Sequence, residues 1–322
     1  MTMQRFRLKD LGQVDRSKPL RFKFDGKFYE GYRGDTLASA LLANGIHLVG
    51  RSFKYHRPRG LLSAGAEEPN ALIQVGEGNS TDPNTRATQI ILRDGLTVKS
   101  QNRWPNLTFD LGYVNSLIHR LLPAGFYYKT FMWPASWWMR YEYWIRRAAG
   151  LGEAPKGADP DRYEKNHAHC DVLIVGSGPA GLSAALAAGQ TGARVILTEE
   201  QDSFGGSLTY NTDCTIDGLP AFEWVKRTVA ALSSMPEVIL LKATVTNGYY
   251  DHNYLTLLES TDNDNQTGSE YKTRQRLWKV RAKRVVLATG QIERPLIFRD
   301  NDRPGIMLSA AMRAYLNRYG VS

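Results

Sequence analysis

The order of hydrophobic and polar positions changes character at Gly176. An unbroken apolar run, Val172–Val175, precedes a glycine-rich turn, and the alanine-rich segment Leu182–Gly189 follows it. A short continuous apolar run is typical of a buried parallel strand, and the alanine-rich segment favours a helix. A second strand is predicted at Arg194–Thr198, after the helix breaker Gly192. This order predicts an α/β fold with parallel strands.

Near the N-terminus, apolar and polar residues alternate on both sides of the dipeptide Asp25-Gly26. Such a dipeptide between alternating runs predicts a β-hairpin. Asp35 is a suitable N-cap for a helix over Thr36–Asn44, which Gly45 would end. Two strands followed by a helix predict a β-grasp domain, the fold of plant-type ferredoxins.

Further apolar runs predict the rest of the second domain. Val238–Val245 predicts one strand, and Arg284–Gly290 predicts another that ends in the tripeptide Ala-Thr-Gly. Between them, residues 246–283 predict a β-meander whose halves are separated by a polar stretch at 261–272. Ser309–Tyr319 predicts an amphipathic helix, after which a parallel sheet would normally continue. We therefore expect the chain to be the N-terminal portion of a longer protein.

The glycine-rich turn matches the pattern G-x-G-x-x-G of dinucleotide-binding sites. Gly176 permits the tight turn, Gly178 lets the backbone approach a pyrophosphate, and Gly181 lets the helix pack closely on the strand. Pro179 and Ala180 lie between the glycines, where amides at the helix N-terminus would face the phosphates. These five residues are candidate cofactor-binding residues.

An acidic residue follows at the distance expected of such a site. Glu199 lies 18 residues beyond Gly181, where a carboxylate accepts hydrogen bonds from ribose hydroxyls. Glu200 and Gln201 are expected to line the same edge. Because a carboxylate would repel a 2′-phosphate, the sequence favours NAD or FAD over NADP. The choice between NAD and FAD stays open, since both carry the same ADP half.

Three later segments strengthen the nucleotide hypothesis, because with the glycine-rich turn they resemble the two-dinucleotide-binding flavoprotein superfamily. A glycine pair follows the acidic residue after a short loop, and Gly206 and Ser207 are candidate cofactor-binding residues there. The resemblance implies that the turn containing Thr289 and Gly290 passes near the same nucleotide. It also implies that Val245 lies beside the adenine.

Composition narrows the class of protein. Hydrophobic residues make up 42% and charged residues 23% of the 322 positions, which is typical of a globular chain of about two domains. No apolar run reaches the roughly 18–20 residues of a membrane span, and the first ten residues lack the apolar core of a signal peptide. With only two cysteines, Cys170 and Cys214, a reducing cytoplasm is the expected location.

A histidine pair beside a cysteine, at His167, His169 and Cys170, could be interpreted as a metal site. No fourth ligand is apparent, and Cys170 directly precedes an apolar strand, where a buried cysteine is ordinary. We therefore predict no metal there.

The net charge of +9 is concentrated near the N-terminus. Residues 1–60 hold 13 Lys and Arg but five Asp and Glu. Such a patch can meet nucleic acid, an acidic ligand or an acidic partner, or it can be a solvated face. Helix-turn-helix, zinc-finger and RNA-recognition motifs are not found, so no nucleic-acid partner is expected.

An aromatic segment separates the two predicted domains. Residues 104–147 contain five Trp and five Tyr interleaved with Arg. A membrane-surface helix or a base-stacking surface would also combine aromatic and basic residues, but this composition is typical of interfaces, so we expect a helical connector packed between domains or subunits. The predicted division is a β-grasp domain at 1–108, the connector and a polar linker at 109–165, and an incomplete Rossmann-type domain at 166–322.

The β-grasp domain lacks the residues that would hold iron. In cluster-bearing relatives of this domain, cysteines spaced C-x4-C-x2-C fall within residues 51–75. Laid on that spacing, the ligand positions are Ser63, Glu68 and Ala71, with a fourth near Thr88. Iron–sulfur clusters need thiolate ligands, or histidine in some cases. We therefore predict a β-grasp scaffold without a cluster.

The whole chain resembles the alpha subunits of the heterotetrameric sarcosine oxidase family. The resemblance rests on this cysteine-free domain and on the segments RSFKYHRPRG, EEPNALIQVG, VGSGPAGLSAA and VVLATGQIERPLIF. It implies an oxidoreductase that demethylates sarcosine to glycine, with formaldehyde or 5,10-methylenetetrahydrofolate and hydrogen peroxide as further products. It also implies NAD in this chain, FAD and FMN in or shared with a partner subunit, tetrahydrofolate beyond residue 322, and beta, gamma and delta subunits as partners.

Two alternative functions stay open. One is an FAD-binding subunit of an opine or other secondary-amine dehydrogenase, and the other is a non-catalytic assembly module. The sequence shows no nucleophile elbow, paired catalytic carboxylates or covalent-flavin motif. We therefore assign no catalytic residue and expect the isolated chain to be inactive.

Overall fold

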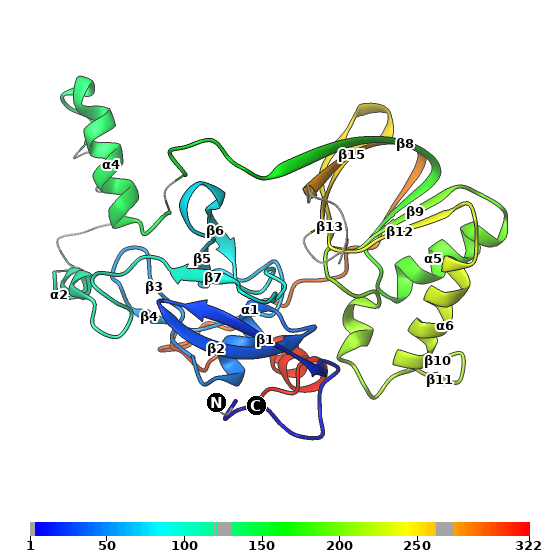
Figure 1. Ribbon diagram of the computed structural model, residues 1–322, viewed down its shortest axis with the longest axis horizontal. Helices are drawn as coiled ribbons and strands as arrows, with labels where there is room; N and C mark the ends of the chain where they lie inside the picture. Colours follow the sequence, from blue (N-terminus) through cyan, green and yellow to red (C-terminus); the bar gives the residue numbers. More distant parts are fainter. Residues whose placement is uncertain (1–3, 119, 121–130, 153, 262–272) are drawn as a thin grey trace. The chain divides into compact units, whose positions relative to one another are not determined.

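The computed structural model describes residues 4–118, 120, 131–152, 154–261 and 273–322 (Figure 1). The chain forms two compact units: the first comprises 1–159, 293–315 and 319–322, and the second comprises 160–292 and 316–318. The sequence-based division differs from this one in assigning all of 166–322 to a single domain. Of the sequence segments discussed above, part of the aromatic connector (121–130) and the polar stretch at 262–272 lie outside the described residues.

A five-stranded sheet forms the centre of the first unit. Strands and helices of this unit are β1 (Asp15–Phe24), β2 (Lys27–Arg33), α1 (Leu37–Ala43), β3 (Gly50–Arg51), β4 (Pro58–Arg59), β5 (Leu72–Val75), β6 (Asp82–Arg86), β7 (Thr97–Ser100), α2 (Val114–Leu117), α4 (Trp138–Ala148) and α7 (Ser309–Arg313). The sheet order is β2-β1-β7-β5-β6, with β1 antiparallel to β2 and parallel to β7. Asp25 and Gly26 join β1 to β2 with φ values of 47° and 84°, as a tight hairpin turn requires. The predicted β-grasp arrangement is confirmed.

Helix α1 has a different N-cap from the one predicted. The Thr36 hydroxyl accepts a hydrogen bond from the Ser39 amide at 3.2 Å, and the Ser39 hydroxyl accepts one from the Thr36 amide at 3.0 Å. Asp35, the predicted cap, instead binds Arg7 through both carboxylate oxygens, at 2.6 and 3.0 Å. The prediction for Asp35 was wrong because a bidentate charged pair is stronger than a single cap bond. Gly45, with φ of 78°, ends the helix as predicted.

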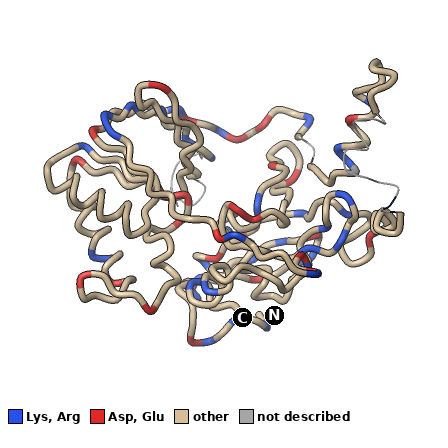
Figure 2. Tube along the Cα trace, turned by 180° about the vertical axis from the view of Figure 1, so that it is seen from behind, with Lys and Arg blue, Asp and Glu red and all other residues tan. Residues whose placement is uncertain are grey.

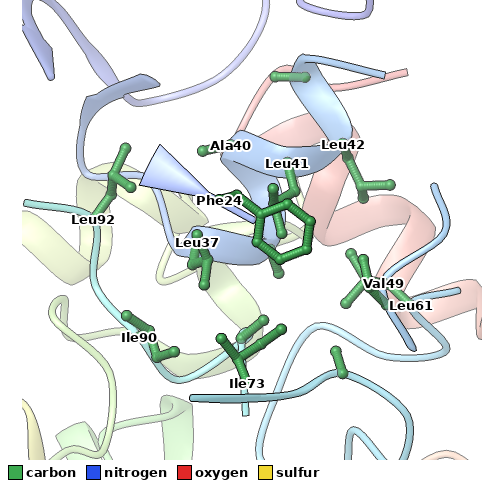
Figure 3. Close-up of a cluster of buried hydrophobic side chains, with 14 of the residues drawn as sticks. Phe24, Leu37, Ala40, Leu41, Leu42, Val49, Leu61, Ile73, Ile90 and Leu92 are labelled. Atoms are coloured by element: carbon green, nitrogen blue, oxygen red, sulfur yellow. The ribbon is translucent and has the colours of Figure 1, made fainter. Parts of the chain in front are cut away.

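The core of the first unit lies between the sheet and α1. All seven residues of α1 are buried. Figure 3 shows Leu37 of α1 beside Phe24 of β1, within a cluster that also contains Leu61. Burying one such side chain contributes about 1.5–3 kcal/mol. Leu61 and Ala71 both belong to this core, so the core fixes the two ends of the loop at 62–70.

The second unit contains a six-stranded sheet. Its strands and helices are β8 (Arg162–Val175), α5 (Pro179–Gln190), β9 (Val195–Thr198), β10 (Thr215–Ile216), β11 (Leu219–Pro220), α6 (Ala221–Ser233), β12 (Val238–Leu241), β13 (Thr244–Tyr250), β14 (Tyr254–Ser260) and β15 (Thr273–Leu287). The sheet order is β12-β9-β8-β15-β14-β13. Strands β12, β9, β8 and β15 pair in parallel, and β13, β14 and β15 form the predicted antiparallel meander. The α/β fold class is confirmed.

The strand boundaries of this unit differ from the predicted ones in two places. Strand β8 starts at Arg162, inside the predicted linker, because it pairs with β15 almost from end to end. The predicted strand Val238–Val245 is instead two strands, β12 and β13, which lie at opposite edges of the sheet. They separate at Ala243, whose φ is 49°. Non-local pairing decides both boundaries.

Both faces of the parallel strands are covered. Figure 1 shows α5 and α6 on the same face of the sheet, where Ile174 packs in a buried cluster with Leu182 and Trp224. On the other face, Leu173 is buried with Leu255 and Leu257 of β14. Burial on both faces explains why Val172–Val175 is apolar throughout.

The predicted helix Ser309–Tyr319 is α-helical only in its first half. It consists of α7 followed by a π-helical turn, η7 (Ala314–Arg318). The carboxylate of Glu293 accepts hydrogen bonds from the amides of Ser309 and Ala310 at 3.1 and 2.8 Å. These amides at the start of α7 have no acceptor within the helix.

The aromatic helix α4 leaves most of its large side chains exposed within this chain. Trp138 and Trp144 are 51% and 65% exposed, and Trp133 and Trp137, which precede the helix, are 83% and 49% exposed. Packing of this helix against another domain or subunit therefore stays a prediction. Among the described residues, no helix is both long and apolar enough to cross a bilayer.

Several basic residues of the N-terminal segment are paired inside the first unit. Figure 2 marks Lys and Arg along the Cα trace. Arg57 contacts Asp300 and Asp302 at 3.2 and 2.8 Å, and Arg59 contacts Asp302 at 2.7 Å. Together with the Arg7–Asp35 pair, these contacts neutralise part of the positive charge counted at 1–60.

Candidate dinucleotide-binding site

The turn between β8 and α5 has a shape that requires glycine at two positions. Gly176 has φ of 97°, and a Cβ there would lie 2.4 Å from the carbonyl oxygen of Ala288. A Cβ on Gly181 would lie 1.9 Å from the carbonyl oxygen of Gly176. At Gly178, by contrast, a Cβ would meet nothing within 4 Å. Packing therefore explains the first and third glycines, and the second borders open space at the position predicted for the pyrophosphate.

Helix α5 presents its N-terminus at this turn. Gly178 is its N-cap, Pro179 is its first residue, and no side chain caps it. Pro179 and Ala180 are exposed. Amides in the first turn of a helix have no partner within the helix and lie at the positive end of its dipole. The amides of Ala180 and Gly181 are therefore suited to bind an anion.

Glu199 lies at the end of β9, beside the glycine-rich turn, and only 6% of it is exposed. Its Oε2 accepts hydrogen bonds from the hydroxyl of Ser177 at 2.5 Å and from the Ser177 amide at 3.1 Å. Its Oε1 accepts one from the Gln201 amide at 3.0 Å. A carboxylate has about four acceptor positions, so Glu199 is held in place and retains capacity for one more donor, such as a ribose hydroxyl.

Sequence reasoning missed Ser177, which is fully buried. Its hydroxyl donates to Glu199 and accepts from the amide of Gly205 at 3.1 Å, and its carbonyl oxygen accepts from the same amide at 3.1 Å. This one residue therefore joins the glycine-rich turn, the acidic residue and the later glycine pair. A hydroxyl residue between the first two motif glycines was the available signal, but its partners lie 22 and 28 residues away.

The later glycine pair packs directly against the turn. Gly206 has φ of 52°, and a Cβ there would lie 3.0 Å from the Cα of Gly178. Ser207 follows it in a short 3-10 helix, η5 (Gly206–Thr209), and is half-buried. Close approach of two backbones therefore requires Gly206, as it does Gly176 and Gly181.

Backbone hydrogen bonds place the other predicted residues near Glu199 and the end of β8. The amide of Thr244 donates to the carbonyl oxygen of Glu199 at 2.8 Å, which places Val245, 40% exposed, next along β13. Thr289 and Gly290 are exposed and follow Ala288, whose amide donates to the Val175 carbonyl oxygen at 2.8 Å. Glu200 is exposed and Gln201 is half-buried.

His167, His169 and Cys170 do not converge. The two histidines are exposed on β8, and Cys170, on the opposite face, is 2% exposed. Burial raises the pKa of the Cys170 thiol to about 11. Among the described residues, no three His, Cys, Asp or Glu side chains are placed to hold a metal ion.

Two family models match parts of the chain. Residues 17–103 match a 2Fe-2S iron–sulfur cluster binding domain, and residues 171–235 match an FAD dependent oxidoreductase. The solved L-proline dehydrogenase from P. horikoshii shares the fold, with a TM-score of 0.63 over 99% of this chain and 50% of its own, at 22% identity.

Curated relatives match nearly the whole chain. Sarcosine oxidase subunit alpha of Rhizobium meliloti (strain 1021) is 56% identical over 321 residues, which cover 99% of this chain and 32% of that relative. Sarcosine oxidase subunit alpha of Corynebacterium sp. (strain U-96) is 38% identical, with 96% of this chain and 28% of that relative covered. The chain thus spans about a third of the length of these relatives.

Proposed function

We propose that this chain, which is homologous to sarcosine oxidase alpha subunits over 99% of its length, is the NAD-binding part of such a subunit. The observation that carries the proposal is the Glu199 carboxylate, fixed by Ser177 beside the open space at Gly178. The whole enzyme would demethylate sarcosine to glycine, forming hydrogen peroxide and either formaldehyde or 5,10-methylenetetrahydrofolate. Beta, gamma and delta subunits would be its partners.

The residues of the second unit fit the ADP half of a dinucleotide. The amides of Ala180 and Gly181 would face the pyrophosphate, and Glu199 would accept hydrogen bonds from the adenosine ribose. The exposed side chain of Val245 would lie against the adenine. The bound nicotinamide would supply hydride-transfer chemistry. Glu199 would repel a 2′-phosphate, which disfavours NADP.

FAD in the same site is the second candidate. The match of residues 171–235 to an FAD dependent oxidoreductase supports it, and both cofactors share the ADP half. In that case the chain would serve an opine or other secondary-amine dehydrogenase. If the chain binds NAD, as in the first proposal, FAD and FMN would be held by or shared with a partner subunit. Tetrahydrofolate would then bind outside the 322 residues.

Substitution of Glu199 tests the proposed site. Glu199→Ala should weaken NAD binding by about 1–3 kcal/mol, because a hydrogen bond to a charged group is lost. Titration calorimetry of NAD, NADP and FAD against the variant and the unmodified chain measures this. Glu237→Ala, an exposed residue of the same unit, is the matched control and should bind as the unmodified chain does. Equal NAD affinity with and without Glu199 would remove it from the site, and tight FAD binding without NAD binding would favour the second candidate.

A further inference from the structure

We infer that the carboxylate of Glu68 takes the place of an iron–sulfur cluster in the β-grasp domain and holds the loop that a cluster would hold. Residues 17–103 match a 2Fe-2S iron–sulfur cluster binding domain. At the four ligand positions, however, Ser63, Glu68, Ala71 and Thr88 offer two hydroxyls, a carboxylate and a methyl group. A cluster of this type needs thiolates, so the residues of this domain do not fit it.

Backbone amides converge on the Glu68 carboxylate from both sides of the loop. Oε2 accepts hydrogen bonds from the amides of Leu62 and Ser63, each at 2.8 Å. Oε1 accepts hydrogen bonds from the amides of Asn70 and Ala71 at 2.8 and 3.2 Å. The side chain is 1% exposed. Four donors therefore surround one buried anion.

A cluster-binding loop needs the same arrangement of amide donors around an anion. Such loops form a concave ring of backbone amides around an anion, and amides donate hydrogen bonds to the sulfur atoms of clusters. Here the anion is supplied by a residue of the loop itself, and it stands at one of the ligand positions. The loop can therefore keep a cluster-type shape with no metal bound.

Two of the other ligand positions contact the same carboxylate, and the remaining one contacts the loop. Ser63 and Ala71 are fully buried and supply two of the four amides, and Thr88 is 5% exposed. The Thr88 hydroxyl donates to the carbonyl oxygen of Gly65 at 2.7 Å. All four positions are therefore buried, and Ser63 and Ala71 meet at the Glu68 carboxylate.

The four amides offset part of the cost of burying the Glu68 carboxylate. Burial raises the pKa of Glu68, and the hydrogen bonds from the four amides act in the opposite direction. Removing the carboxylate would leave buried amides without an acceptor, which costs more than an ordinary lost hydrogen bond. Glu68 is therefore expected to be a structural residue.

The first experiment uses chemical rescue in the 322-residue chain. Glu68→Ala should lower the melting temperature by at least about 5 °C and increase amide hydrogen exchange at residues 62–71. Formate is a small carboxylate that can reach the four amides, so it should restore part of both losses by mass action. Glu67→Ala, at the exposed neighbouring residue, should show neither the loss nor the response to formate.

A second variant keeps the test decisive where Glu68→Ala does not fold. Glu68→Gln preserves the shape but turns an NH2 group towards two of the amides, so exchange at 62–71 should still rise relative to Glu67→Gln. Exchange at 62–71 equal to that of the control would overturn the inference. So would a folded Glu68→Ala without a formate response, or two irons with acid-labile sulfide in the unmodified chain after anaerobic purification.

Discussion

Ser177 is the residue through which the candidate site holds its carboxylate. Its hydroxyl makes the shortest hydrogen bond to Glu199, at 2.5 Å, and it touches Gly205 as well. Both side chains are buried, so water cannot replace the bond without a rearrangement. The position of Glu199, and with it the proposed contact to the ribose, therefore depends on Ser177.

Substitution of Ser177 should act mainly through Glu199, because the Gly205 amide keeps the Ser177 carbonyl oxygen as its acceptor. Ser177→Ala is expected to weaken NAD binding about 5–10-fold, since one charge-assisted hydrogen bond that orients the carboxylate is lost. In a chain that already carries Glu199→Ala, the same change should cost nothing further. Titration calorimetry of the two single variants and the double variant measures this coupling. Additive losses would mean that Ser177 acts on the nucleotide independently of Glu199.

Single-residue predictions succeeded where a local rule decides the outcome. Asp25-Gly26 and Gly45 adopt the positive φ values that their sequence context requires. Ser177 and Asp35 were missed or misassigned because their partners, Glu199 and Arg7, are distant in sequence. The composition of the loop ruled out cysteine ligands, but only the folded chain places four amides around Glu68.

The strand–turn–helix unit of β8 and α5 depends on Gly176 and Gly181 for its packing and leaves the Cβ position of the middle glycine, Gly178, free of contacts. The Cβ of an alanine at Gly181 would lie 1.9 Å from the Gly176 carbonyl oxygen, whereas one at Gly178 would meet nothing within 4 Å. Gly178 also has φ of −65°, which any residue adopts. Gly178 and Gly181 should therefore respond differently to substitution by alanine.

Alanine substitution at these glycines should separate stability from binding. Gly181→Ala should lower the free energy of unfolding by about 1–3 kcal/mol, because α5 must move away from β8. Gly178→Ala should leave stability nearly unchanged and weaken NAD binding, since its methyl group would enter the space proposed for the pyrophosphate. Urea unfolding and calorimetry of both variants measure the contrast. A Gly178→Ala variant as unstable as Gly181→Ala would contradict the packing argument.

At the level of elements, periodicity located the parallel strands and the helix, because they are buried and locally regular. Periodicity predicted β8 and β15 too short. Their outer halves are stabilised by pairing with each other, between residues far apart in sequence. The break at Ala243 carried no signal, because a positive φ is unusual for alanine. Tertiary pairing determined what the local pattern could not.

For the whole molecule, the described groups of the second unit converge on the place proposed for one end of a dinucleotide. Glu199, the α5 N-terminus and the glycine-rich turn all suit phosphate or ribose, and none of them suits an amine substrate. The chain spans about a third of the length of the relatives it matches. The proposed oxidation would therefore need residues outside these 322 positions.

We accordingly expect no sarcosine-dependent hydrogen peroxide from this chain alone, with or without added FAD and NAD. Amine oxidation requires a flavin ring and a substrate held in contact with each other, and in the proposed function the flavins are held by or shared with a partner subunit. A coupled peroxide assay on the isolated chain, and on a complete alpha subunit assembled with its beta, gamma and delta partners, measures the difference. Activity should appear only in the assembled complex. Turnover by the isolated chain at an enzyme-like rate, about 1–1,000 per second, would show that the active site lies within these residues.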